Sequence, residues 1–248
     1  MQEITGTIFN NASPIVHNKP KKKQFSMTFS TFNIKRICDI ADKISKKVLI
    51  QVEGATCSGK TSFVADAYAM LRQRKIDAMI IEEAATQILT EDSILFEQLV
   101  ACPKESEQWK KCKLKLQQKV LSHQVRSLER LAENDTQILA LMDRGGASTA
   151  YHTVPLLSEA DKKVVERICR ETARMSSQIV LLSPIGFLHR DSPRYQKNLD
   201  EIRVEYRGIK RYLNKWGLNY IEIPSIKKNA RLNIGLRHIL PLLCDGEQ

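Results

Sequence analysis

Short, mostly apolar runs recur along the chain, and each is followed within two residues by a glycine, a proline or an acidic residue. Runs of this length and composition predict strands that are buried on both faces, as in a parallel sheet. The five predicted strands are 48–52, 76–81, 138–142, 178–182 and 218–223. Longer amphipathic or charged segments separate them, so the pattern predicts an α/β fold with helices between the strands.

The separating segments have helical periodicity or helix-ending residues, except for 145–151, where the glycines permit a close turn and Ser148, Thr149 and Tyr151 follow in a polar segment. The predicted helices are 31–47, 61–71, 92–100, 105–133, 158–174, 197–216 and 229–243. In the longest helix, one face carries leucines together with Gln117 and Gln124. A buried amide either bonds within the protein or offers a donor and an acceptor to a ligand edge, so both interpretations stay open.

The segment between the first strand and the following helix fits G-x-x-x-x-G-K-[ST], the phosphate-binding loop. Its residues are Gly54, Ala55, Thr56, Cys57, Ser58, Gly59, Lys60 and Thr61, and Ser62 follows in the helix. In such a loop the backbone N–H groups and the helix N-terminus bind phosphate. We expect Lys60 to reach the β- and γ-phosphates of ATP and the Thr61 hydroxyl to bind Mg²⁺.

Charged residues follow the second and third predicted strands, at the edge where α/β sheets bind ligands. Glu82 and Glu83 end the second strand, and we expect at least one of them to act at the site, although the sequence does not decide which. Asp143 ends the third strand, where an acid is the usual companion of a phosphate loop and holds Mg²⁺. The planar guanidinium of Arg144 suits contacts to substrate or phosphate oxygens.

A proline-containing basic segment after the fourth strand includes Arg190 and Arg194. Two arginines in such a segment suit a lid, near 187–197, that closes on phosphates and neutralises the charge that develops on the γ-phosphate. The alternative is a solvated basic loop.

The chain of 248 residues has a net charge of +11, which is compatible with nucleic acid, anionic membrane or anionic small substrates. Residues 1–47 carry nine Lys or Arg and three acids, so more than half of the excess precedes the first strand. We expect residues 1–30 to form a basic, flexible tail. No apolar run approaches the length of a membrane span, and six scattered cysteines without a CxxC pair favour reduced, cytoplasmic thiols over disulfides or zinc.

These motifs together resemble those of the nucleoside and nucleotide kinases of the P-loop superfamily. The likeness is closest to the AAA-domain group that includes nicotinamide-riboside-kinase-like proteins. Besides the phosphate loop, the matching features are Glu83-Ala84-Ala85, the helix with Gln117 and Gln124, Asp143-Arg144-Gly145, Arg194-Tyr195, and Tyr212, Gly217 and Pro224. The resemblance implies a three-layer P-loop NTPase fold, with a parallel five-stranded sheet in the order 2-3-1-4-5 and helices on both faces.

The resemblance also implies transfer of the ATP γ-phosphoryl group to a nucleoside, a nucleotide or a similar small hydroxyl or phosphate acceptor. We expect Glu83, or else Glu82, to act on the acceptor hydroxyl. Gln117, Gln124 and Arg144 would position the acceptor. The expected organisation is a tail at 1–30, a helix at 31–47 and a kinase-like domain at 48–248.

Two other functions remain open. A nucleic-acid 5′-end kinase or nucleic-acid-stimulated ATPase would suit the net charge, but the basic excess lies mostly in the tail and no aromatic-interleaved basic motif is present. A regulatory NTPase whose output is a conformation would use the same phosphate loop. The sequence identifies neither the acceptor nor the oligomeric state.

Overall fold

The computed structural model describes residues 33–136, 139–185 and 198–244. A parallel sheet of five strands lies at its centre, in the order β2-β3-β1-β4-β5. The strands are β1 (Val48–Gly54), β2 (Ala78–Ile81), β3 (Leu139–Asp143), β4 (Gln178–Leu182) and β5 (Ile221–Ile223). Both the α/β fold class and the strand order expected from the resemblance are confirmed.

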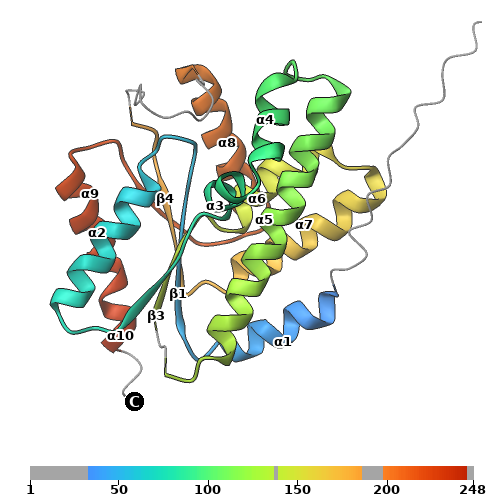
Figure 1. Cartoon of the computed structure of the whole chain (residues 1–248). Helices are drawn as coiled ribbons and strands as arrows, with labels where there is room; N and C mark the ends of the chain where they lie inside the picture. Colours follow the sequence, from blue (N-terminus) through green and yellow to red (C-terminus); the bar gives the residue numbers. More distant parts are fainter. Residues whose placement is uncertain (1–32, 137–138, 186–197, 245–248) are drawn as a thin grey trace, which may run out of the picture.

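Helices cover both faces of the sheet and make the three layers seen in Figure 1. They are α1 (Ile34–Ile44), α2 (Lys60–Gln73), α3 (Ala84–Glu91), α4 (Ser93–Ala101), α5 (Glu107–Glu133), α6 (Gly146–Thr153), α7 (Glu159–Arg174), α8 (Leu199–Lys215), α9 (Lys228–Ile239) and α10 (Pro241–Cys244), with a 3₁₀ turn, η2, at Val154–Leu156. Helices α2 and α9 pack on one face, and α1, α5, α6 and α7 pack on the other. Several helices begin at a side-chain cap, because Asn33, Asp92, Ser106, Ser158 and Asn198 each accept a bond from a backbone N–H group of the first turn.

Two segments differ from the sequence prediction. The polar segment 145–151, for which no helix was predicted, belongs largely to helix α6, whose N-terminus is held by side chains of β1 rather than by a local cap. The predicted helix 229–243 is two helices that meet at Pro241, which has no backbone N–H to continue the first one. The tail at 1–30 and the expected lid at 187–197 lie outside the described residues.

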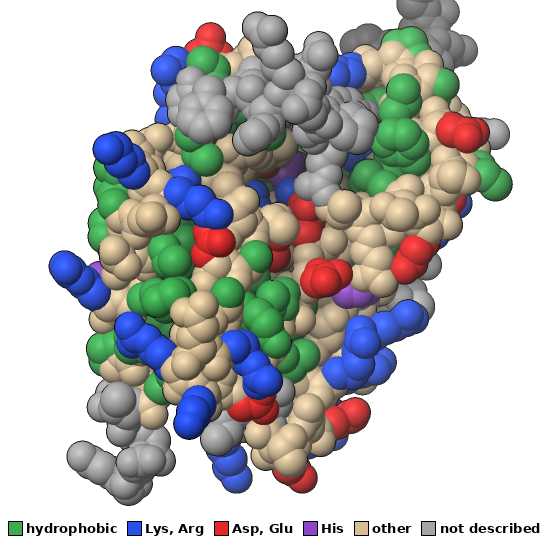
Figure 2. All heavy atoms as spheres, turned by 60° about the vertical axis from the view of Figure 1, so that its left-hand side comes forward, with side chains coloured by type: hydrophobic (Ala, Val, Ile, Leu, Met, Phe, Trp, Pro, Cys, Tyr) green, Lys and Arg blue, Asp and Glu red, His purple; other side chains and the backbone are tan. Residues whose placement is uncertain are grey.

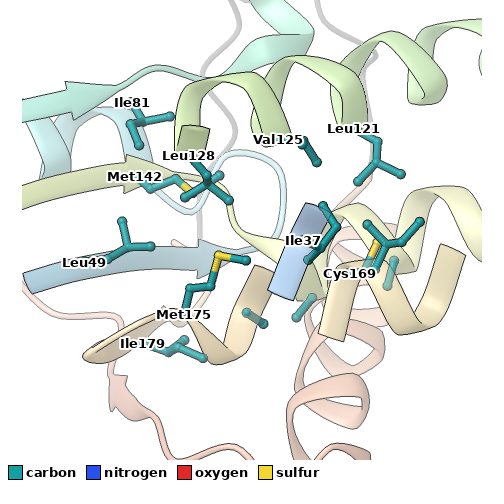
Figure 3. Close-up of a cluster of buried hydrophobic side chains, with 14 of the residues drawn as sticks. Ile37, Leu49, Ile81, Leu121, Val125, Leu128, Met142, Cys169, Met175 and Ile179 are labelled. Atoms are coloured by element: carbon teal, nitrogen blue, oxygen red, sulfur yellow. The ribbon is translucent and has the colours of Figure 1, made fainter. Parts of the chain in front are cut away.

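Alternate residues of the central strand supply the two halves of the core. Leu49 faces the cluster shown in Figure 3, where it lies with residues of α1, α5 and α7. Ile50 and Val52 face the opposite cluster, against α2 and α9. This alternation follows from the two-residue period of a strand, and it fixes the strand ends relative to both helical layers.

The strands end together at one edge of the sheet, which is where the phosphate loop begins. In the register of the sheet, Val52 lies beside Asp143, and Gly54 lies beside Leu182. A third cluster, formed by α3, α4 and the first half of α5, stands beside this edge. None of the helices in the described ranges has the length and apolarity that a bilayer crossing requires.

Candidate active site

The phosphate loop connects β1 directly to α2, as its motif predicts. Gly54 has φ 148° and Gly59 has φ 83°, a region that favours glycine. A Cβ atom on Gly54 would lie 2.6 Å from Ser58 Oγ and 2.8 Å from the Leu182 carbonyl. Both glycines are therefore required for the tight path of the loop.

Lys60 begins α2, and its side chain is only 7% exposed. Its Nζ donates hydrogen bonds to the carbonyls of Gly54 at 2.9 Å and Ala55 at 2.8 Å. Burial lowers the pKa of the Lys60 ammonium, and nearby carboxylates, that of Asp143 foremost, oppose this shift. The ammonium thus lies against the concave side of the loop, where phosphate oxygens can replace the carbonyls as acceptors.

Thr61 and Asp143, predicted as metal ligands, lie in direct contact. The Thr61 hydroxyl donates to Asp143 Oδ2 at 2.6 Å, while the buried Oδ1 has no hydrogen-bond partner. Burial raises the pKa of the Asp143 carboxyl, although Lys60 and the Thr61 hydroxyl lower it. Hard oxygen donors of this kind suit Mg²⁺, which is usually bound by one or two carboxylates together with substrate phosphates.

Of the two adjacent acids after β2, Glu83 is turned inward and Glu82 is exposed. Glu83 Oε1 lies 2.8 Å from a guanidinium nitrogen of Arg144, and Oε2 accepts a bond from the Thr86 hydroxyl at 2.7 Å. The Glu83 and Arg144 residues are 8% and 9% exposed. The geometry therefore brings Glu83, and not Glu82, into the group that contains Asp143 and Lys60.

Arg144 is held by backbone contacts as well as by Glu83. Its φ of 78° is unusual for a residue other than glycine, and its N–H donates to the Val52 carbonyl at 3.0 Å. Burial opposes its charge, but the carboxylates of Glu83 and then Glu205 hold the pKa of Arg144 above its ordinary value. The guanidinium is thus a fixed positive charge beside the strand ends.

Both glutamines of the α5 stripe bond within the protein. Gln124 Nε2 donates to the Arg144 carbonyl at 3.1 Å, and its Oε1 accepts from the Thr149 hydroxyl at 2.8 Å. Gln117 Oε1 accepts a longer bond, of 3.4 Å, from Thr153. Gln124 therefore supports the backbone of Arg144, and an acceptor contact by either glutamine stays a prediction.

Two side chains of β1 hold the N-terminus of α6 and were not identified from the sequence. Gln51 Oε1 accepts from Gly146 N at 3.3 Å, and Glu53 accepts from Ala147 N at 2.9 Å and from the backbone and hydroxyl of Ser148. Burial raises the pKa of the Glu53 carboxyl, and the hydrogen bonds from α6 oppose this upward shift. The sequence signal for this contact was the presence of two polar residues, Gln51 and Glu53, in a buried strand, because buried polar side chains require hydrogen-bond partners.

A second unpredicted group joins α8 to the phosphate loop. Glu205 is 1% exposed, and its Oε1 accepts from the Thr56 hydroxyl at 3.2 Å and lies 3.0 Å from His152 Nε2. Glu205 lies on the inner face of α8 with Ile202, Ile209 and Leu213. An acid within that apolar stripe was the sequence signal for it.

Two cavities border the phosphate loop on opposite sides of α2. The α3-side cavity, of about 510 Å³, contains Thr61 and Asp143 and extends along α3. Four of its lining residues are the acids Glu82, Glu83, Glu91 and Asp143, and none of its described lining residues is Lys or Arg. The loop-side cavity, of about 480 Å³, lies between the loop and α9 and is largely apolar.

Arg231 of α9 lines the loop-side cavity and is 5% exposed. It donates to the Ser58 carbonyl at 2.8 Å and to the Ser183 carbonyl at 2.6 Å. Within the described chain, no carboxylate lies at salt-bridge distance from it. Arg231 is thus a buried cation that connects the phosphate loop to the end of β4, whereas Arg190 and Arg194 lie outside the described residues.

Comparisons with known proteins agree with this arrangement. A family model described as an AAA domain matches residues 49–231. Among solved structures, NadR protein in complex with NR matches with a TM-score of 0.57 at 15% identity, over 79% of this chain and 53% of that one. NadR protein in complex with NAD and AMP-PNP matches with a TM-score of 0.51 at 15% identity, over 79% and 49%. The chain spans about half of each of these structures, and its likeness to them establishes the fold alone. No curated protein matches the sequence.

Proposed function

The chain belongs to the AAA-domain family of P-loop proteins, and on that premise we propose that it transfers the γ-phosphoryl group of ATP to a hydroxyl group of a nucleoside-like acceptor. One observation carries the proposal. The Thr61–Asp143 pair, at the end of the phosphate loop, lines one cavity together with the inward-turned carboxylate of Glu83.

On the nucleotide side, the loop amides and Lys60 would bind the phosphates, and Thr61 and Asp143 would hold Mg²⁺. When bound, the metal neutralises charge on the phosphate oxygens. The loop-side cavity adjoins Gly59 and Ser62, and this position supports the proposal that it receives the base and ribose of the nucleotide. Arg231 contributes a fixed positive charge close to the loop, which favours an anionic ligand.

On the acceptor side, the charge of the cavity discriminates between acceptor classes. Its carboxylates would repel an acceptor that already carries phosphate, because like charges brought together cost several kcal/mol. Arg144 pairs with Glu83 and offsets that one charge, so Glu82, Glu91 and Asp143 are the carboxylates that remain to repel a phosphate. The cavity therefore favours an uncharged hydroxyl-bearing acceptor, such as a nucleoside, over a nucleotide.

The chain's residues would then divide the transfer between them. The acceptor oxygen bonds to the γ-phosphorus, the bond from that phosphorus to the bridging oxygen breaks, and ADP leaves. Glu83 takes the proton of the acceptor hydroxyl, a role that typically contributes about a hundred- to ten-thousand-fold in rate. Lys60 stabilises charge on the phosphates during the step, the role that the sequence also predicts for Arg190 and Arg194, which lie outside the described residues.

An acceptor screen tests the proposal. Purified protein with ATP and Mg²⁺ is incubated with nucleosides, nucleoside monophosphates and 5′-hydroxyl oligonucleotides, and ADP release is measured with and without each acceptor. We expect at least one hydroxyl acceptor to stimulate ADP release and to gain a phosphate by mass spectrometry. ADP release that no acceptor stimulates would contradict the kinase proposal and favour an ATPase or a switch.

A further inference from the structure

Helix α5 presents a face of exposed basic residues beside the α3-side cavity. Lys115, Lys119, Arg126 and Arg130, here called the α5 basic face, are spaced by four, seven and four positions, so they lie on one side of the helix. At 1.5 Å per residue they extend over about 22 Å. That length corresponds to roughly six or seven nucleotides of a B-form strand.

The charges of the α5 basic face are mostly not neutralised. Lys119 pairs with Asp92 at 2.7 Å, but Lys115, Arg126 and Arg130 have no carboxylate at salt-bridge distance in the parts of the chain that the structure describes. Glu129 of the same helix is turned to Arg36 of α1. The face therefore keeps a net positive charge, even with Glu133 at the C-terminal end of the helix.

Contacts place the α5 basic face next to the cavity. Lys119 binds Asp92, which directly follows α3, and α3 lines the cavity through Glu91 and its neighbours. His123, between Lys119 and Arg126 in the helix, has its pKa lowered by burial and by Arg130, against the charges of Glu91 and other acids. On the face seen in Figure 2, Lys and Arg side chains gather beside a histidine, below carboxylates.

We propose that the acceptor is the 5′-hydroxyl end of a nucleic acid strand. The acidic cavity suits the terminal nucleoside, which carries no 5′-phosphate, and the α5 basic face suits the phosphates that follow it. A free nucleoside would leave the basic face unused, and an anionic membrane would offer nothing for the acidic cavity. The inference rests on the proposed phosphoryl transfer, with the 5′-oxygen as the attacking atom and its proton passing to Glu83.

Anisotropy titration of the full chain tests binding without catalysis. The probes are 12-nucleotide single strands of DNA and RNA with a 5′-hydroxyl and a 3′-fluorophore, measured from 50 to 300 mM salt. We expect the Arg126→Gln/Arg130→Gln variant to bind at least one probe about tenfold more weakly than the parent chain. The slope of log affinity against log salt should fall by about 1.4, since each lost phosphate contact removes about 0.7.

A matched variant distinguishes an effect of the α5 basic face on binding from an effect of the overall net charge. Arg211→Gln/Arg237→Gln removes the same charge from exposed positions on α8 and α9, and it should bind the probe within twofold of the parent. Thermal unfolding verifies that both variants are folded. Three results would each overturn the proposal. They are equal losses of probe affinity in the two variants, no binding of either probe by the parent chain, and binding of anionic phosphatidylserine vesicles without binding of any oligonucleotide.

A phosphorylation assay on the same probes distinguishes this inference from the proposed function. A strand that binds through Arg126 and Arg130 but gains no phosphate supports the surface and contradicts the phosphoryl transfer. Phosphorylation of free nucleosides supports the proposed phosphoryl transfer. If the Arg126→Gln/Arg130→Gln variant then binds oligonucleotides as tightly as the parent chain, the proposal that the acceptor is a nucleic acid strand is overturned. A probe with a 5′-phosphate should bind at least fivefold more weakly than the 5′-hydroxyl probe, because the acidic cavity repels its end.

Discussion

Replacing Glu83 by Gln separates the proposed catalytic role of this carboxylate from its structural role. Glu83 forms a buried ion pair with Arg144 at 2.8 Å, so the substitution removes a charge that compensates the guanidinium. Removing one partner of a buried pair costs about 3–5 kcal/mol. Gln keeps an oxygen acceptor, and Glu205 and Asp143 still act on the Arg144 charge, so we expect a smaller cost of about 1–3 kcal/mol.

That loss of stability is too small to abolish activity by unfolding. For a domain of this size, 1–3 kcal/mol lowers the melting temperature by about 2–12 °C. Native stability is ordinarily about 5–15 kcal/mol, so more than roughly 95% of the Glu83→Gln protein stays folded at 25 °C. A loss of a general base, in contrast, lowers the transfer rate by about a hundredfold or more.

The assay compares acceptor phosphorylation and AMP-PNP affinity at 25 °C in the parent chain, Glu83→Gln and Glu82→Gln. We expect Glu83→Gln to lose at least a hundredfold in transfer rate while its AMP-PNP affinity stays within threefold. Glu82 is exposed and bears the same chemical change, so its variant should lose less than tenfold. A Glu83→Gln rate above one tenth of the parent rate would refute the base assignment, as would a parallel loss of AMP-PNP affinity.

Three further predictions concern the surroundings of the site. Gly145→Ala should destabilise the fold by about 2–3 kcal/mol in chemical denaturation, because its Cβ would lie 1.9 Å from Gln51 Oε1. In the control Gly217→Ala, the Cβ meets no atom within 4 Å, so the cost should be only about 1 kcal/mol, from the positive φ. Equal costs for the two variants would contradict the packing argument. Arg231→Met should weaken AMP-PNP binding at least tenfold in calorimetry, and unchanged affinity would exclude a role in nucleotide binding. Partial burial opposes the charge of Glu222, but the bond from Lys210 lowers the pKa of this carboxyl below its ordinary value of 4.5. The stabilisation of the fold by charged Glu222 is therefore present above pH 4.5 and is lost as pH falls through the lower folded-state pKa. Glu222→Gln should cost less than about 1 kcal/mol at pH 7, and a cost that persists at pH 3 would contradict this linkage.

The nucleotide side of the site was predictable because its signals are local in sequence. The loop motif, the strand before it and the helix after it are contiguous, and the sequence correctly predicts the path from β1 to α2. Asp143 was identifiable because an acid follows an apolar run, and the sheet register then brings it beside β1. The choice between Glu82 and Glu83 was not predictable, since it depends on which way the chain turns into α3.

The supporting residues were missed because their partners are distant in the chain. Glu53 binds α6 about ninety positions away, and without that contact the glycines after Asp143 indicate a close turn rather than the start of a helix. Glu205 meets Thr56 across 149 positions, and Arg231 meets Ser58 across 173. A periodic pattern identifies such residues only as polar exceptions on apolar faces, without indicating what they contact.

Equilibrium binding of Mg²⁺-ATP to the parent chain and to Lys60→Met tests the central claim most directly. Methionine keeps much of the buried aliphatic stem of Lys60 and removes only the ammonium that lies against the loop. We predict that calorimetry detects ATP binding by the parent chain and at least a hundredfold weaker binding by Lys60→Met. Lys43→Met, at an exposed position of α1, should match the parent. Equal ATP affinity in all three proteins, or none in the parent chain, would contradict a nucleotide-binding phosphate loop.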